Sequence, residues 1–127
     1  MKQVLFIAAG GALGSVLRFG VAGAVQGLTG GTFPIGTLVV NLVGCPLIGL
    51  INGALTGPIQ VAPEYRLALT IGLLGGMTTF SRFGWETVEL LDSREWWRAG
   101  LNVLASVALG LAAVWLGHRL ALRWLGV

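Results

Sequence analysis

The chain has 127 residues, of which 55% are hydrophobic and only 10% are charged, and its formal net charge is +3. A soluble domain normally carries about a quarter charged residues, so this composition argues against a water-soluble protein. The positive charge does not indicate a nucleic-acid-binding protein either, because the basic residues are scattered and gather near the ends of apolar segments. The composition therefore predicts an all-α membrane protein.

Four apolar segments follow one another along the chain. No charged residue lies between Phe19 and Pro63 or between Ala99 and Gly117, and a helix that spans a bilayer needs about 20 apolar residues. Division of the chain at its polar and proline-containing stretches predicts one transmembrane domain over residues 1–127, with spans at about 4–25, 35–55, 65–91 and 97–122. The N-terminal "MKQVLFIAAGGALG" is interpreted as the start of a retained first span, because no cleavage site followed by a polar domain appears.

An even number of spans places both termini on the same side of the membrane as the loop between the second and third spans. The basic residues favour that side four to two: Lys2, Arg66, Arg119 and Arg123 lie there, and Arg94 and Arg98 lie opposite. So small a bias leaves two interpretations open, a cytoplasmic preference for the termini or insertion in both orientations with pairing to an inverted copy. Glycine pairs at four-residue spacing, such as Gly10/Gly14 and Gly72/Gly76, favour close helix packing and an oligomer.

Two polar side chains lie deep in the first two spans. Arg18 can either extend to the far interface or attract anions into a water-filled vestibule. Asn41 is in the middle of the second span, where its amide must find partners, so it either hydrogen-bonds to another helix or lines an ion path. Asn52 and Asn102 lie nearer to span ends, and we expect them to form only local hydrogen bonds.

The third span contains an irregular stretch, "GLLGGMTTFSRF", at residues 72–83. Gly75 and Gly76 favour a break in the helix, and a second helical segment after it can be capped by Thr78, Thr79 and Ser81. A helix broken within a membrane is tolerated only where protein or a polar cavity buries its free backbone groups. Carbonyls that face inward favour a small cation there, whereas N–H groups and helix N-termini favour anions.

The residues that follow this break suggest ion chemistry rather than catalysis. Phe80 and Phe83 share one helix face and either pack together or present their positive ring edges to an anion. Arg82 and Glu86 are four residues apart, so they can form a structural ion pair or set the charge of a pore mouth. The sequence contains no nucleophile with a base and no phosphate-binding loop, and we expect a protein that is not an enzyme.

Three segments together resemble one known family. "GGMTTFSRF" (residues 75–83) resembles the GGxTTFSTF signature of the fluoride channels of the Fluc (CrcB) family. "GTLVVNLVG" (36–44) and "GALGSVLRF" (11–19) resemble that family's segments on the second and first spans. The resemblance covers essentially the whole chain and implies an antiparallel, dual-topology homodimer with two fluoride pores and a central sodium ion. It also implies a multi-pass location in the plasma membrane, which is the inner membrane of a bacterium.

The resemblance further implies roles for individual residues. The backbone carbonyls of Gly75 and Thr78 would bind the sodium ion from both subunits. Phe80 and Phe83 would contact fluoride edge-on, and Asn41 would donate a hydrogen bond to it. The remaining positions of the implied pore lining are Thr37, Thr79, Ser81 and Ser106. Arg18 and Glu86 would lie at the pore entrance, and Arg82, which departs from the signature, would add its own charge to that entrance.

The function implied by the resemblance is passive export of fluoride from the cytoplasm, which relieves fluoride toxicity without an energy source. Two features depart from the family pattern: Arg82 replaces a threonine of the signature, and "LGLAAVW" (109–115) lacks hydroxyl side chains after Ser106. They keep open a second reading, a non-conducting partner subunit or paralogue of such a channel. A small multidrug exporter is disfavoured, because its mechanism needs a carboxylate in the first span and none is present there.

Overall fold

Three long helices and a fourth, interrupted helical path form the fold. The computed structural model describes residues 1–56 and 59–125, and all regular secondary structure in these ranges is helical. Each long helical run is long and apolar enough to cross a membrane: α1 (Lys2–Thr29), α2 (Ile35–Leu55), and the run formed by α6 (Trp96–Leu104), the π-helical segment η2 (Ala105–Leu109) and α7 (Gly110–Leu125). The interrupted path consists of α3 (Pro63–Leu67), the π-helical segment η1 (Ala68–Leu74), α4 (Gly75–Met77) and α5 (Phe80–Asp92).

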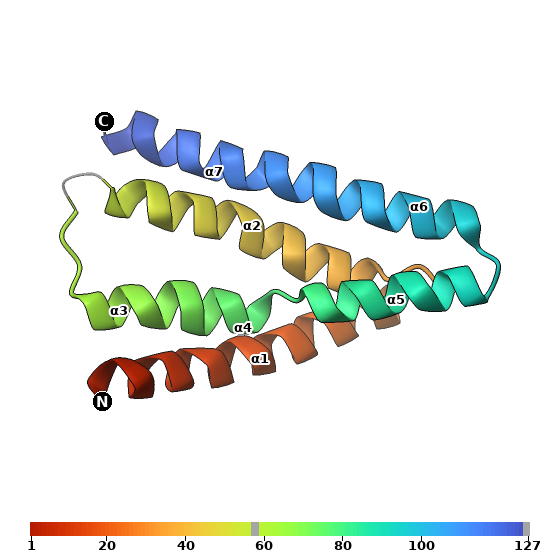
Figure 1. The fold of residues 1–127 in the computed structure, drawn as a ribbon, viewed down its shortest axis with the longest axis horizontal. Helices are drawn as coiled ribbons and strands as arrows, with labels where there is room; N and C mark the ends of the chain where they lie inside the picture. Colours follow the sequence, from red (N-terminus) through yellow and green to blue (C-terminus); the bar gives the residue numbers. More distant parts are fainter. Residues whose placement is uncertain (57–58, 126–127) are drawn as a thin grey trace.

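The helices lie side by side along one direction (Figure 1). The start of α1, the end of α7 and the start of α3 are at one end of the molecule, and the α1–α2 and α5–α6 connections are at the other. The segments α3, η1 and α4 lie beside α1, and α5 continues from their end. This arrangement is the one that an even number of passes requires.

The break in the third helical path lies at Thr78 and Thr79. These two residues have extended backbone conformations, with φ/ψ of −85°/157° and −153°/120°. The sequence predicted a break in this span, but it placed the break at Gly75 and Gly76, and that position is wrong. Gly75 has helical angles of −63°/−36°, and the chain leaves the helix only after Met77. Gly72 and Gly76 serve helix packing instead.

Glycines bring the backbone of α1 into direct contact with η1 and α4. A Cβ atom placed at Gly72 would lie 2.8 Å from the carbonyl oxygen of Ile7, and one at Gly76 would lie 2.7 Å from that of Gly11. From the other side, a Cβ at Gly14 would overlap the carbonyl of Leu73. Small residues at four-residue spacing allow this approach, which explains the spacing seen in the sequence.

Few side chains of this small helical layer are buried. The buried apolar residues are Leu38, Val40, Leu74, Phe83, Leu90, Ala99 and Ala121. Large apolar side chains are exposed along every long helix, among them Val16, Leu47 and Leu111. Apolar exposure on this scale is that of a surface covered by lipid or by another protein chain rather than by water.

Candidate functional site

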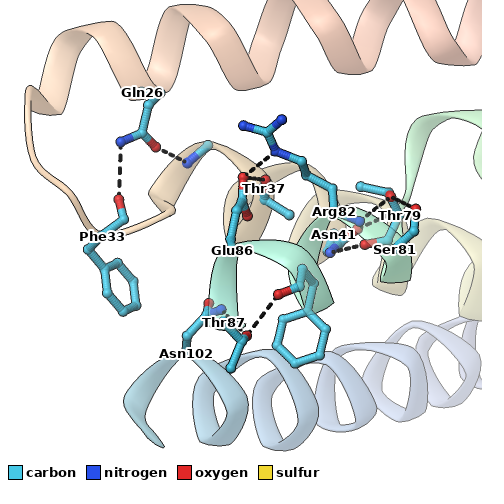
Figure 2. Close-up of polar contacts among 12 residues, drawn as sticks. Gln26, Phe33, Thr37, Asn41, Thr79, Ser81, Arg82, Glu86, Thr87 and Asn102 are labelled. Carbon is cyan, nitrogen blue, oxygen red and sulfur yellow. Dashed lines mark hydrogen bonds and ion pairs between the residues drawn. The ribbon is translucent and has the colours of Figure 1, made fainter. Parts of the chain in front are cut away.

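The broken backbone of the third helical path is held by one side chain from α2. The Asn41 amide donates its Nδ2–H to the carbonyl oxygen of Thr79 at 3.1 Å, and its Oδ1 accepts the Thr79 N–H at 2.8 Å (Figure 2). Thr79 is only 8% exposed, so both of its backbone groups need partners. Of the two alternatives for Asn41, a bond to another helix is therefore present, and it is made at the break itself.

Side chains at the break cap the two helical ends. The Thr79 hydroxyl accepts the N–H of Arg82 at 3.2 Å, which makes Thr79 the N-cap of α5. The Thr78 hydroxyl donates to the carbonyl of Leu74 at 2.9 Å and so satisfies the last turn of the preceding segment. Ser81 does not cap the helix directly, because its hydroxyl bonds to that of Thr79 at 3.2 Å. Capping from this stretch was expected, and Thr79 is the residue that performs it.

Two cavities meet at Thr79. The first, which we call the aromatic cavity, has a volume of about 530 Å³ and is lined by Asn41, Gly44, Cys45, Ile48, Thr70, Leu74, Gly75, Thr78, Thr79, Phe80, Phe83, Ser106 and Val107. The second, which we call the charged cavity, has a volume of about 960 Å³, and its polar lining residues include Ser15, Arg18, Gln26, Thr32, Thr37, Thr79, Ser81, Arg82, Glu86, Glu89 and Glu95. The predicted pore residues and entrance residues therefore gather on the two sides of the break.

The two phenylalanines of the signature line the aromatic cavity together. Their ring centroids are 5.4 Å apart with an interplanar angle of 52°. Phe83 is 9% exposed, whereas Phe80 is 81% exposed. Phe83 is thus held by the protein, and Phe80 needs a further surface to cover it.

The predicted ion pair forms one wall of the charged cavity. The Nε–H of Arg82 donates to Oε1 of Glu86 at 2.6 Å. The hydroxyl of Thr37 donates to the same oxygen at 2.8 Å, across from α2 to α5 (Figure 2). Oε2 of Glu86 is buried and has no hydrogen-bond partner within residues 1–56 and 59–125. Helical spacing predicted the contact with Arg82, while the contact with Thr37 needed the tertiary structure.

Arg18 points to the break. Its Nη1 lies 3.5 Å from the carbonyl oxygen of Thr78, and its side chain lines the charged cavity. Of the two alternatives for Arg18, this placement favours the one in which the residue faces a polar cavity.

The carbonyl of Gly75 has the chemistry that a sodium ligand needs. In a continuous helix the N–H of Thr79 would donate to this carbonyl, but here it donates to Asn41. The oxygen is thereby released from its helical partner, and oxygen ligands suit hard cations. The carbonyl of Thr78, which contacts Arg18, has two lone pairs and can also accept a second partner. Among the described residues no cluster of His, Cys, Asp and Glu side chains offers another metal site.

Ser106 lies on η2 and faces the aromatic cavity. Its Oγ is buried and has no hydrogen-bond partner in the described part of the chain. Thr70 of η1 lines the same cavity, so a π-helical segment lies on each of two sides of it. Such segments are common at functional sites, and the apolar periodicity of the sequence did not reveal them.

The contact of Asn102, on α6 beside the site, was predicted wrongly. It is 2% exposed, and its Nδ2 donates across to the Thr87 hydroxyl of α5 at 2.9 Å. That hydroxyl in turn donates to the carbonyl of Phe83 at 2.8 Å. The bond is interhelical rather than local, because α5 and α6 fold back on each other at the Ser93–Glu95 turn. The four-residue spacing of Phe83 and Thr87 could have indicated the bond within α5, but no local pattern links Asn102 to Thr87.

Gln26 is a second residue that the sequence reading missed. Its Nε2 donates to the carbonyl of Phe33 at 3.1 Å (Figure 2) and to that of Gly31 at 2.8 Å. Its Oε1 accepts the N–H of Gly36 at 3.1 Å. These three bonds tie the end of α1 to the start of α2 and shape one end of the charged cavity.

Comparison with known proteins supplies a separate line of information. A family model described as CrcB-like protein, Camphor Resistance (CrcB), matches residues 5–118. A protein of Geobacter sulfurreducens named fluoride-specific ion channel FluC is 52% identical over 117 residues, or 92% of this chain and 94% of that protein. Proteins with the same name from Solibacter usitatus and Opitutus terrae are each 50% identical over 121 residues, covering 95% and 93% of this chain and 99% and 91% of theirs.

Proposed function

The chain belongs to the CrcB family, and on that premise we propose that it is a passive, fluoride-selective channel that lets fluoride leave the cytoplasm. It is a multi-pass protein of the bacterial inner membrane. The observation that carries the proposal is the Asn41–Thr79 contact. It holds open a break at which the aromatic and charged cavities meet.

Partial positive charges follow one another through the two cavities. Arg18 and the Ser81 hydroxyl are on the charged side, and Asn41 is at the junction. Asn41 uses one of its two amide N–H donors on Thr79, so a second donor remains for an anion. On the aromatic side, the ring edges of the phenylalanines and the Ser106 hydroxyl continue the path. Fluoride would exchange its hydration shell for these groups in steps that none of them makes tight enough to trap it.

An inverted second copy of the chain completes the proposed channel. Phe80 is 81% exposed in one protomer, although it lines the aromatic cavity. The wide opening of both cavities and the extensive apolar surface support a partner that covers them. In this homodimer the interrupted path of α3–η1–α4 and α5 forms a fourth crossing of the membrane.

The proposed sodium ion would be held by backbone carbonyls of Gly75 and Thr78 from both copies. When bound, it supplies a positive charge where carbonyls gather at the C-terminal end of the α3–α4 run, which carries the negative end of the helix dipole. The release of the Gly75 carbonyl by Asn41 supports this site. Two carbonyls from one chain are too few for an oxygen-coordinated cation, so the site also depends on the second copy.

The test is fluoride efflux from liposomes that contain the purified protein, followed with a fluoride electrode and with chloride efflux as the specificity control. We expect fast fluoride efflux from the unmodified chain, a large loss in Phe80→Ile, and no loss in the matched variant Phe6→Ile, because Phe6 lies outside both cavities. Equal efflux of chloride would refute selectivity. A silent protein that copurifies with a different chain would instead support the alternative, a non-conducting partner subunit or paralogue.

A further inference from the structure

Arg82 stands in the first turn of α5, directly after the break. Its backbone N–H is bound by the Thr79 cap, and its side chain reaches forward to Glu86. The guanidinium side chain remains 65% exposed, whereas the Glu86 side chain is 11% exposed. The pair thus joins an exposed cation to a carboxylate that lies inside the wall of the charged cavity.

The buried carboxylate of Glu86 needs a counter-charge. A buried carboxylate with no counter-charge is costly, and it repels any anion nearby. One of its oxygens accepts both Arg82 and Thr37, while the other has no partner among residues 1–56 and 59–125. Thr37 is neutral, so Arg82 is the residue in contact with Glu86 that cancels its charge.

The other charges of the charged cavity do not replace Arg82. Glu95 has its own arginine, because Arg98 donates to it at 2.6 Å. Glu89 also lines the cavity and adds negative charge. Arg18 is the remaining cation of the lining, and its guanidinium is directed to the carbonyl of Thr78 rather than to Glu86. Removal of Arg82 would therefore leave Glu86 and Glu89 as an anion-repelling mouth.

We propose that Arg82 is a positioning and specificity-determining residue that makes this mouth passable to an anion, by fixing and neutralising Glu86. The inference rests on the proposed channel function. It opposes the reading in which the arginine at this position marks a non-conducting subunit. Since only the Arg82 side of the pair is exposed and Glu86 is buried, loss of Arg82 also affects folding, and the experiment has to separate folding from conduction.

The experiment measures fluoride efflux from liposomes for Arg82→Met, Arg82→Lys and the double variant Arg82→Met/Glu86→Gln. Arg123→Met serves as the matched control, because it removes one positive charge from an exposed position outside both cavities. Elution of each variant from gel filtration in detergent verifies folding. A charged cleft changes encounter rates by about tenfold or more, so we expect a loss of at least about tenfold in Arg82→Met.

Three further results are expected together. Arg82→Lys keeps most of the efflux because the charge remains, and the double variant recovers most of the loss because no carboxylate charge is left to repel fluoride. The loss in Arg82→Met shrinks as impermeant salt is added, because salt screens the repulsion. A folding defect alone would produce neither the recovery nor the salt response.

Each contrary result has a distinct meaning. Efflux from Arg82→Met that equals or exceeds that of the unmodified chain overturns the inference and leaves the channel in place. A slow double variant also overturns it, because Glu86 would then not be the source of the loss. Silence in the unmodified chain and in every variant overturns the proposed function and the inference together.

Discussion

Replacement of Asn41 by alanine is the most informative single change to this protein. It removes the two bonds between the Asn41 amide and the backbone of Thr79, at 2.8 and 3.1 Å. Because Thr79 is the N-cap of α5, its carbonyl keeps a helical partner, and the N–H is the group left without a bond. Thr79 is only 8% exposed, so water reaches this N–H poorly. A buried polar group left without a partner costs about 1–3 kcal/mol, and we expect the free energy of unfolding to fall by roughly that amount, with interhelical bonds in membranes favouring the lower end.

The assay for Asn41→Ala is unfolding in mild detergent, followed by tryptophan fluorescence, together with fluoride efflux from liposomes. Asn52→Ala is the matched control on the same helix, because no side-chain hydrogen bond of Asn52 is present in the described part of the structure. Asn41→Asp separates the two bonds: it keeps the acceptor for the Thr79 N–H, so part of the stability should remain while the added negative charge abolishes efflux. A loss of stability below about 0.5 kcal/mol with unchanged efflux would refute the role of Asn41 at the break.

Three further predictions concern packing, positioning and orientation. Gly76→Ala places a Cβ 2.7 Å from a carbonyl of α1 and should cost about 1–3 kcal/mol of unfolding free energy. The control Gly20→Ala meets nothing within 4 Å and should cost nothing. Equal effects of the two variants would contradict the packing of α1 against α4. Asn102→Leu removes a buried interhelical bond, so it should lower stability by about 1 kcal/mol and slow efflux, and full efflux would show that this bond does not position the aromatic cavity. With Cys45→Ala as background, Ser93→Cys in the exposed α5–α6 turn should react with an impermeant thiol reagent from both sides of the membrane, and labelling from one side alone would exclude dual topology.

Local patterns predicted much of this protein. The apolar lengths predicted the three continuous spans, and the polar stretch at residues 72–83 predicted an interrupted one. The spacing of Arg82 and Glu86 predicted their ion pair. In each case the interacting residues lie within a few turns of one another, so hydropathy and helical periodicity contain the information.

Contacts between distant segments were not predicted in this way. The expected local bonding of Asn102 was wrong, because the rotation of α6 against α5 turns this amide toward Thr87. The position of the break was also wrong. In the sequence Gly76 indicates a helix break, but in the structure it lies within the helix, where the close approach of α1 leaves no room for a Cβ atom.

The sequence by itself determined the class of the molecule, an apolar helical chain of the CrcB family with an interrupted third span and an arginine next to its signature aromatics. The tertiary structure alone decided where the interruption lies and what supports it. Asn41 and Thr79 are 38 positions apart, and helical periodicity does not relate residues on different helices. Their meeting depends on the register between α2 and the third helical path, which the packing of whole helix surfaces establishes.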